Sequence, residues 1–253
     1  MTQQFTGKAS AYTKGRSDYP EALFDDLYHK YGFAPDSVIA DIGSGTGKFC
    51  QPLLMRGSIV YAVEPNEDML HAAPSFLRSA SNYHPVKASA ESTTLPDASI
   101  DHITCAAAFH WLDAKAFHAE CRRILKPGGL VVMAWNVRDR EAPLNRAHAE
   151  VFRRFCPKFT SLSHGFDACQ ADLSIFYGGK YERIAYEDST VQDKKKFLAR
   201  SLSSSYALKP KDAEYAGFVS ALEELFDAWK QDGVVTVPAQ CIAFIGTPHA
   251  SFC

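Results

Sequence analysis

A cluster of glycines at the end of an apolar segment constrains the fold more than any other feature of this sequence. Residues 38–42 have the length and composition of a buried strand, and Gly43, Gly45 and Gly47 follow them directly. An apolar pattern resumes at residues 49–55. The order of strand, tight turn and helix is typical of an open α/β sheet, which binds its ligands at the carboxyl ends of its strands.

The same alternation of strand and helix patterns continues to residue 136. An amphipathic helix is expected at residues 20–31, before the glycine cluster. Later strands are expected at residues 58–65, 83–88, 100–108 and 130–135. Such alternation predicts a mostly parallel sheet with helices on both faces.

We therefore expect a single Rossmann-like α/β domain over residues 1–253, with a seven-stranded sheet and a small helical cap. Its expected parts are an N-terminal segment and helix (1–34), a ligand-binding core (35–136), cap helices (137–180 and 190–232) and final strands (181–189 and 233–247).

The composition narrows the classes of partner. The 253 residues carry a formal net charge of −2, with acids and bases mixed along the chain, so no basic face for nucleic acid is expected. No run of 18 or more apolar residues occurs, and the N-terminus lacks the apolar core of a secretory signal, which predicts a cytoplasmic protein without a membrane span. The seven cysteines form no CxxC pair, which argues against structural zinc. The expected partner is a small molecule, and the expected assembly is a monomer or a homodimer.

Three classes of ligand use glycine loops of this kind, and the neighbouring residues separate them. A phosphate-binding P-loop needs a glycine where Ile42 stands and a serine or threonine after Lys48, which Phe49 follows instead. The dinucleotide fingerprint GxGxxG needs its third glycine at position 48, so a nicotinamide cofactor is the weaker alternative. The observed GxGxG pattern fits a charged nucleoside better.

Two carboxylates flank the loop. Asp41 stands two residues before Gly43, and Glu64 closes the second expected strand. Glu64 can accept hydrogen bonds from both hydroxyls of a ribose, because a carboxylate is purely an acceptor. Asp41 would repel a pyrophosphate but attract the ammonium and the sulfonium of S-adenosylmethionine. Asp41 could instead cap the loop by binding its backbone amides, and this alternative stays open.

Several segments together resemble the class I S-adenosylmethionine-dependent methyltransferases, of the methyltransferase type 11 kind. They are DIGSGTG (41–47), VEPNEDML (63–70), ASAESTTLPDASID (88–101), FHWLD (109–113) and ILKPGGLVVMAW (124–135), in the usual order and spacing. Phe5, Ala9 and Tyr12, with GRSDYP (15–20) and SLSSSY (201–206), look like the branch that includes trans-aconitate methyltransferase-like proteins. The resemblance covers residues 1–136 most closely.

The resemblance implies that the N-terminal segment before the first helix folds as a flap over the cofactor. It assigns S-adenosylmethionine to residues of this flap, the glycine loop and the ends of the strands. These are Tyr12, Arg16, Asp41, Gly43, Gly45, Gly47, Glu64, Ser89, Ala90 and Ala106. The glycine motif would hold the methionine part, Glu64 the ribose, and Ser89 with Ala90 the adenine. Many relatives carry aspartate where this chain has Ser89. Ala106 and Ala107 would leave room for the methionine part, or they are ordinary small core residues.

The acceptor side is expected after the fourth strand and in the cap. His110 could act as a base or contact the substrate, and Trp111 could wall the pocket, but structural roles are equally credible for both. Tyr19 belongs to the flap region and is a further candidate for substrate contact. Other candidates lie in the cap by position alone, and these are Arg138, Arg140, Arg200 and Tyr206.

Three hypotheses for function remain open. The leading one is formation of a methyl ester on a small carboxylic acid, whose anion is already nucleophilic and needs cationic anchors rather than a base. The second is O- or N-methylation of a hydroxylated or aromatic metabolite, with His110 as the base. The third, of another class, is a non-catalytic protein that binds a nucleoside.

Overall fold

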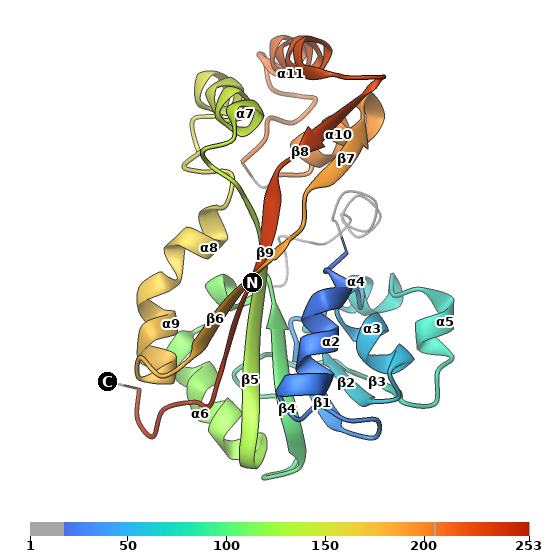
Figure 1. Ribbon diagram of the computed structural model, residues 1–253, viewed down its shortest axis with the longest axis vertical. Coiled ribbons are helices and arrows are strands. Elements are labelled where there is room, and N and C mark those ends of the chain that lie inside the picture. Colours follow the sequence, from blue (N-terminus) through green and yellow to red (C-terminus); the bar gives the residue numbers. More distant parts are fainter. Residues whose placement is uncertain (1–17, 205, 253) are drawn as a thin grey trace.

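The computed structural model describes residues 18–204 and 206–252, and Figure 1 shows their arrangement. Tyr12 and Arg16 lie outside the described residues. The strands are β1 (Val38–Ile42), β2 (Ile59–Val63), β3 (Tyr83–Val86), β4 (Ile100–Ala106), β5 (Leu125–Arg138), β6 (Glu182–Glu187), β7 (Thr190–Asp193), β8 (Val234–Val237) and β9 (Ala239–Gly246). The helices are α2 (Glu21–Lys30), α3 (Cys50–Met55), α4 (Glu67–His71), α5 (Ser75–Arg78), the 3-10 helix η2 (Phe109–Trp111), α6 (Ala114–Ile124), α7 (Pro143–Phe155), α8 (His164–Ala168), α9 (Gln170–Tyr177), α10 (Lys194–Leu202) and α11 (Tyr215–Trp229).

One seven-stranded sheet has the order β3-β2-β1-β4-β5-β9-β6. The strands from β3 to β5 are mutually parallel, whereas β9 runs antiparallel to β5 and β6. This confirms the expected mostly parallel sheet. The chain order reverses between β1 and β4, which is the point at which an open α/β sheet binds its ligands.

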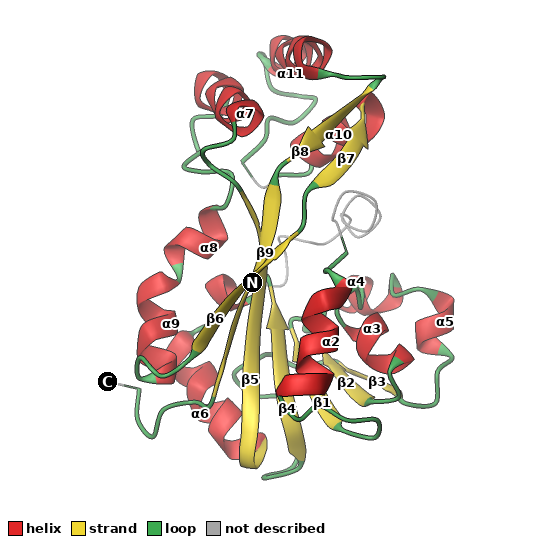
Figure 2. Ribbon diagram, viewed as in Figure 1, coloured by secondary structure: helices red, strands yellow, loops and turns green. Residues whose placement is uncertain are grey.

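Helices cover both faces of this sheet, as expected (Figure 2). On one face Phe117 of α6 and Phe176 of α9 pack with their ring centroids 5.7 Å apart, in a core that includes Trp135 of β5. On the other face Phe24 of α2 and Leu53 of α3 are fully buried in a second core with residues of β1 and β2. Packing on both faces holds the strand ends, and with them the glycine loop, in place.

A second lobe, which we call the upper lobe, consists of α7, α10, α11 and the two-stranded sheet of β7 and β8 (Figures 1 and 2). Its own core gathers Phe152 of α7, Phe197 of α10 and Phe218 of α11, which are almost completely buried. The carboxyl ends of β4 and β5 point toward this lobe (Figure 1).

The structure differs from the expected cap over residues 137–180. Of its helices, α7 lies in the upper lobe, but α9 packs on the main sheet. Tyr177 of α9 donates a hydrogen bond to Val131 O at 3.1 Å, and Leu173 and Phe176 are buried in the core beside α6. The stripe of apolar residues on α9 therefore completes one face of the sheet instead of covering a ligand.

The expected final strand at residues 233–247 is divided at Pro238. Proline lacks the amide proton that a continuous ladder needs. As a result β8 pairs with β7 in the upper lobe, and β9 enters the main sheet. The expected helical cap at 190–232 likewise begins with a strand, because β7 precedes α10.

Two helices begin at a residue whose side chain caps the helix. Asn66 Oδ1 accepts a hydrogen bond from Asp68 N at 3.0 Å at the start of α4. Asp113 Oδ1 accepts one from Ala116 N at 2.9 Å at the start of α6. Both caps satisfy amide groups that have no partner within the helix.

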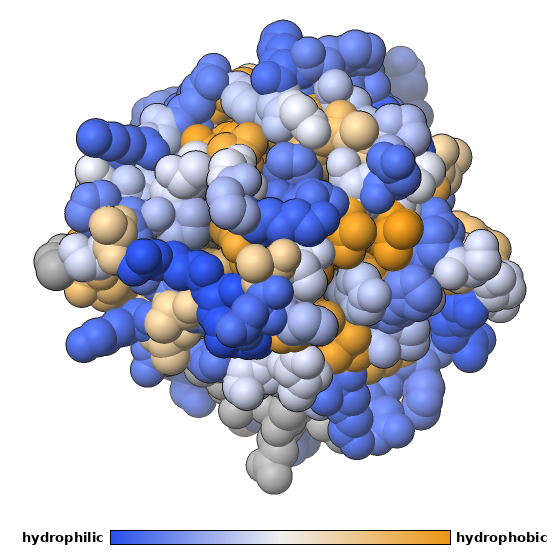
Figure 3. All heavy atoms as spheres, turned by 90° about the horizontal axis from the view of Figure 1, so that it is seen from below, coloured by the Kyte–Doolittle hydropathy of each residue, from blue (hydrophilic) through white to orange (hydrophobic). Residues whose placement is uncertain are grey.

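The remaining sequence expectations concern thiols, metals and the surface. The described cysteines, Cys50 to Cys241, are all buried and unpaired. Within residues 18–204 and 206–252, no group of His, Cys, Asp and Glu side chains could hold a metal, and no helix is long and apolar enough to cross a membrane. Figure 3 shows the end of the molecule opposite the upper lobe, where hydrophobic side chains lie scattered among hydrophilic ones.

Candidate active site

A cavity lies at the carboxyl end of the sheet, between the glycine loop and the upper lobe, and we call it the glycine-loop cavity. It is lined by Tyr19, Asp41, Gly43, Ser44, Thr46, Lys48, Phe49, Ala106, Ala107, Asn136 and Arg200. The ends of β1 and β4, strand β5 and helix α10 all contribute to this lining. The cavity thus brings together residues that the sequence places more than a hundred positions apart, and several of them are sequence-predicted: Tyr19, Asp41, Gly43, Ala106 and Arg200.

Gly43 is required where the loop meets the chain that leaves β4. Its φ is +67°, in the left-handed region that favours glycine, and a Cβ built on it would lie 2.5 Å from Ala108 Cβ. At Gly45 the φ is +56°, but a Cβ would meet only Met69 Cε, at 3.5 Å. Gly43 therefore permits close backbone packing, whereas the missing side chain of Gly45 leaves space beside the loop.

Two hydroxyls of the loop are buried without a hydrogen-bond partner among the described residues. They are Ser44 Oγ and Thr46 Oγ1, and both residues line the glycine-loop cavity. A buried hydroxyl without a partner costs about 1–3 kcal/mol. A polar ligand seated against the loop would satisfy both groups, so the loop fits the polar end of a bound molecule.

The carboxylate of Asp41 lies beneath the loop and is only 1% exposed. Thr104 Oγ1 donates to Asp41 Oδ1 at 2.7 Å, and Cys50 Sγ donates to Oδ2 at 3.0 Å. In the described part of the chain these side chains, rather than loop amides, bind Asp41, so the capping alternative does not match this geometry. Burial raises the pKa of Asp41 to about 6, against the effect of the two hydrogen bonds, and the charge of Glu64 raises it further. A cation placed beside this buried group would stabilise its ionised form.

Glu64 directly follows β2 and is tied to the glycine loop. Its Oε2 accepts a hydrogen bond from Gly45 N at 3.1 Å, and its Oε1 accepts one from Asn66 N at 2.9 Å. Burial raises the pKa of Glu64, while the two amides oppose that shift. The two oxygens of a carboxylate offer about four acceptor positions. Both oxygens of Glu64 therefore keep capacity for the two hydroxyls of a ribose.

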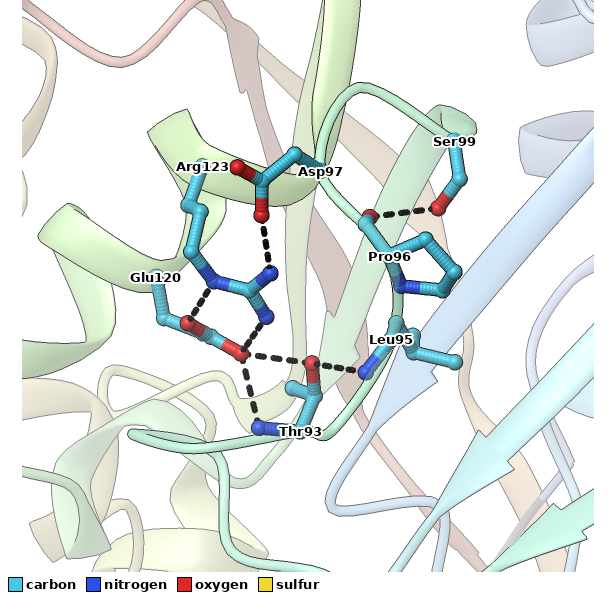
Figure 4. A network of polar contacts seen from close by, with 7 residues as sticks. All are labelled: Thr93, Leu95, Pro96, Asp97, Ser99, Glu120 and Arg123. Atoms are coloured by element: carbon cyan, nitrogen blue, oxygen red, sulfur yellow. Dashed lines mark hydrogen bonds and ion pairs between the residues drawn. The ribbon is translucent and has the colours of Figure 1, made fainter.

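The loop after β3, which carries Ser89 and Ala90, is held in place by α6 (Figure 4). Ser89 is exposed, and Ala90 is buried. Glu120 of α6 accepts hydrogen bonds from Thr93 N at 2.7 Å and Thr93 Oγ1 at 2.6 Å, and it forms an ion pair with Arg123. Burial raises the pKa of Glu120, but Arg123 and Thr93 outweigh this effect and hold it at about 2.

Replacing Glu120 by glutamine should lower the free energy of unfolding by about 2 kcal/mol at neutral pH, because Thr93 and Arg123 lose a charged acceptor. The folded-state pKa lies below the ordinary value of 4.5, so this stabilisation is present above pH 4.5 and is lost as the pH falls toward 2. Denaturant unfolding should therefore show a smaller difference between variant and wild type at about pH 3 than at neutral pH.

The control for Glu120 is the replacement of Glu150 by glutamine. Glu150 forms an ion pair with Arg153 at the same spacing of three residues, but on an exposed face of α7, where such pairs contribute little. Equal losses of stability in the two variants would contradict the anchoring role of Glu120.

His110 and Trp111 lie on η2 beside α8 and do not belong to the lining of the glycine-loop cavity. Trp135 Nε1 donates a hydrogen bond to His110 Nδ1 at 3.4 Å. The imidazole packs on Gly165 of α8, where a Cβ would lie 2.4 Å from Nε2. A neutral imidazole that accepts at Nδ1 carries its proton on Nε2. The lone pair that a general base needs is therefore directed at Trp135, and this placement does not favour His110 as the base.

The cavity meets the flap region through Tyr19 and the upper lobe through Arg200. Tyr19 packs edge-on against Phe49, with ring centroids 4.9 Å apart. Arg200 reaches the cavity from α10. Arg138, at the end of β5, contacts His148 of α7 instead.

The last two cap candidates lie elsewhere. Arg140 is exposed and forms an ion pair with Asp167 of α8. Tyr206 packs edge-on against Phe152, with ring centroids 5.0 Å apart, in the core of the upper lobe. Neither belongs to the lining of the glycine-loop cavity.

Sequence reasoning gave no role to several residues of the site. Ser44 and Thr46 stand between the glycines, and Asn136 follows a predicted strand, so their positions were readable from the motif. Thr104 and Cys50 carry no such signal. Strand pairing brings Thr104 beside Asp41, and the packing of α3 brings Cys50 there.

Comparison with protein families and curated proteins identifies relatives. A model of the methyltransferase domain matches residues 40–133. An uncharacterised methyltransferase of Mycobacterium bovis is 33% identical over 154 residues, which are 61% of this chain and 60% of that protein. An uncharacterised methyltransferase of Geobacillus sp. is 30% identical over 156 residues, which are 56% of this chain and 72% of that protein. The chain thus spans about 60% of the length of the mycobacterial relatives that it matches.

Solved structures share the fold. A protein of Anaeromyxobacter dehalogenans described as a type II methyltransferase matches with a TM-score of 0.62 and 23% identity, over 92% of this chain and 99% of that one. A Geobacter sulfurreducens methyltransferase in complex with S-adenosylhomocysteine matches with a TM-score of 0.54 and 16% identity, over 98% of this chain and 99% of that one. At these identities the likeness establishes the Rossmann-like fold.

Proposed function

This chain belongs to the class I, S-adenosylmethionine-dependent methyltransferases, and we propose that it transfers a methyl group to a small carboxylic acid. One observation carries the proposal: Arg200, from the upper lobe, lines the same cavity as the glycine loop. Arginine binds carboxylates through two parallel hydrogen bonds. Arg200 thus lines the space that the methyl donor would take.

The lining of the glycine-loop cavity and the neighbouring residue Glu64, which binds Gly45 N of the same loop, fit the cofactor by their chemistry. The partnerless hydroxyls of Ser44 and Thr46 would meet polar atoms of the methionine part. Asp41 would offset positive charge, and Glu64 would accept from the ribose hydroxyls. The resemblance to relatives adds Ser89 and Ala90 as the adenine contact.

When bound, S-adenosylmethionine would supply an electrophilic methyl carbon. A carboxylate oxygen would bond to this carbon while the carbon–sulfur bond breaks and its electron pair stays on sulfur. No proton moves, so the protein needs no base. Its residues hold the two reactants in line, which can contribute roughly 7–11 kcal/mol. The rings of Tyr19 and Phe49 form an apolar part of the lining, which would exclude water from the reacting atoms.

Two arguments support an acid as the acceptor. The N-terminal segment and residues 201–206 resemble the branch that includes trans-aconitate methyltransferase-like proteins. This resemblance favours di- and tricarboxylic acids as acceptors. Methylation of a neutral hydroxyl or an ammonium group would require loss of a proton. The geometry of His110 does not favour that role, so the site suits an acceptor that is already an anion.

Incubation of the protein with S-adenosylmethionine and a panel of di- and tricarboxylic acids should yield methyl esters. Replacing Arg200 by methionine should then lower kcat/KM for the acid about 10²-fold, because two charged hydrogen bonds are lost. The matched control is Arg140→Met, which removes an exposed arginine outside the cavity and should leave kcat/KM unchanged. Product is measured by mass spectrometry, and cofactor affinity by titration calorimetry.

Different outcomes would contradict different parts of the proposal. Methylation of phenols or amines, but of no acid, would contradict the acceptor class. Loss of cofactor affinity in Arg200→Met, with an unchanged KM for the acid, would assign Arg200 to the carboxylate of the cofactor. Cofactor binding without any product from any acceptor would favour a non-catalytic nucleoside-binding protein.

A further inference from the structure

A histidine inside the upper lobe contacts side chains from both lobes. His148 of α7 is fully buried, and its ring lies 5.0 Å from that of Phe152 and 4.8 Å from that of Phe197. His148 Nδ1 is 2.7 Å from Arg138 Nη1, and His148 Nε2 is 3.0 Å from Ser201 Oγ. One imidazole therefore connects the end of β5 in the main sheet with α10 in the upper lobe.

Both partners of His148 stand next to residues of the glycine-loop cavity. Arg138 comes two residues after Asn136, which places it on the same face of β5. Ser201 directly follows Arg200 on α10. Asn136 and Arg200 both line the cavity.

The hydrogen bonds fix the direction of each donor in this network. Ser201 Oγ donates its proton to Phe197 O at 2.8 Å, so His148 must donate from Nε2 to Ser201. Nδ1 of the neutral ring then accepts from Arg138. Burial lowers the pKa of His148 well below its ordinary value, and the charge of Arg138 acts in the same direction. The serine proton is thus engaged elsewhere, and Ser201 with His148 does not form an activated nucleophile.

We propose that His148 is a positioning residue that holds Arg138 in the orientation that binds the carboxylate of the acceptor, next to the cavity that Arg200 lines. This inference rests on the proposed function. A free arginine side chain has about 2 kcal/mol of rotamer entropy, and a fixed contact removes part of that cost before the substrate binds. Because His148 is buried in the core of the upper lobe, it provides a rigid partner for Arg138.

Three substitutions of His148 separate its two hydrogen bonds. Asparagine places an amide oxygen near the position of Nδ1 and can still accept from Arg138. Glutamine places an amide nitrogen near the position of Nε2 and can still donate to Ser201. Phenylalanine keeps the stacked ring and makes neither bond. With succinate, glutarate and citrate as probes, His148→Phe and His148→Gln should raise KM for the acid about 10- to 10²-fold, with a smaller change in kcat.

The conservative variant and the cofactor supply the controls. His148→Asn should restore KM to within about threefold of wild type, and all three variants should bind S-adenosylmethionine with unchanged affinity. A merely structural role would lower stability without this division between Asn and Gln. An unchanged KM in His148→Phe, or a parallel loss of cofactor affinity, would overturn the positioning role.

A second measurement does not depend on turnover. In arginine-labelled protein, succinate should shift the Nε–H signal of Arg138 in wild type and in His148→Asn, but not in His148→Phe. If no acid is methylated but this pattern is found, the proposed reaction fails and the positioning role stands. If succinate shifts the signal equally in all variants, or in none, the positioning role fails.

Discussion

Replacing Glu64 by alanine should weaken the binding of S-adenosylmethionine by about 10²-fold or more and leave the protein folded. Hydrogen bonds to a charged group contribute about 1.5–3 kcal/mol each, and about 1.4 kcal/mol corresponds to a tenfold change in affinity. The carboxylate also accepts from Gly45 N and Asn66 N, so its loss releases the glycine loop as well. Titration calorimetry measures the affinity, and circular dichroism confirms the fold.

The control is Asp101→Ala, at the opposite end of the sheet. Asp101 accepts a hydrogen bond from Val38 N at 2.8 Å and forms an ion pair with Lys126 at 2.7 Å. This variant loses a comparable carboxylate and a comparable amide contact but should keep its cofactor affinity. S-adenosylhomocysteine has the same ribose and should lose affinity for Glu64→Ala to the same extent. Equal affinities of both variants for S-adenosylmethionine would contradict the role of Glu64.

The residues that could be predicted from the sequence are those fixed by local chain order. In a parallel sheet the carboxyl ends of the strands lie at one edge, so Asp41, Gly43 and Glu64, at or just after two such ends, are expected to lie close together once their strands are recognised. The structure places Asp41 and Gly43 on the cavity and ties Glu64 to the loop through Gly45. Caps such as Asn66 are equally local.

Residues that depend on tertiary packing could not be predicted in this way. The position of Arg200 follows from how α10 packs in the upper lobe, and the sequence offered only its membership in the cap. His110 was expected at the acceptor because it follows β4, but the short helix η2 turns its ring toward Gly165 of α8. Glu120 binds Thr93, which lies 27 positions away in the sequence, and neither segment carries a sequence pattern that predicts this contact.

In the segment 137–180, the position of whole helices likewise depends on tertiary packing and could not be predicted from the sequence. Its apolar residues are compatible with a cap or with a layer on the sheet. Where such a helix packs depends on which surface still exposes apolar side chains. Here Phe117 of α6 provides such a surface and packs against Phe176.

Replacing Asp41 by asparagine should stabilise the ligand-free protein at neutral pH while weakening its binding of S-adenosylmethionine. The folded-state pKa of Asp41 is raised from 3.8 to about 6, so the folded protein holds this proton more tightly than the unfolded chain. The wild type therefore loses stability as the pH rises from about 4 to about 6. Asparagine removes that loss and can still accept from Thr104, so the variant should gain up to about 3 kcal/mol above pH 6 and almost nothing at pH 4.

The affinity for the cofactor should instead increase as Asp41 becomes ionised. A cationic ligand favours ionised Asp41, so wild-type affinity should rise up to about tenfold per pH unit below pH 6 and level off above it. Asp41→Asn should bind more weakly above pH 6 and show a flatter profile, as measured by calorimetry from pH 5 to 8. Asp101→Asn is a control in which the change in stability should have the opposite sign. An ion pair with Lys126 helps to lower the pKa of Asp101, so neutralising this carboxylate should destabilise the protein. If the affinity of wild type and of Asp41→Asn changed with pH in parallel, ionisation of Asp41 would not be coupled to cofactor binding. The positive charge of the cofactor would then need another partner in the cavity.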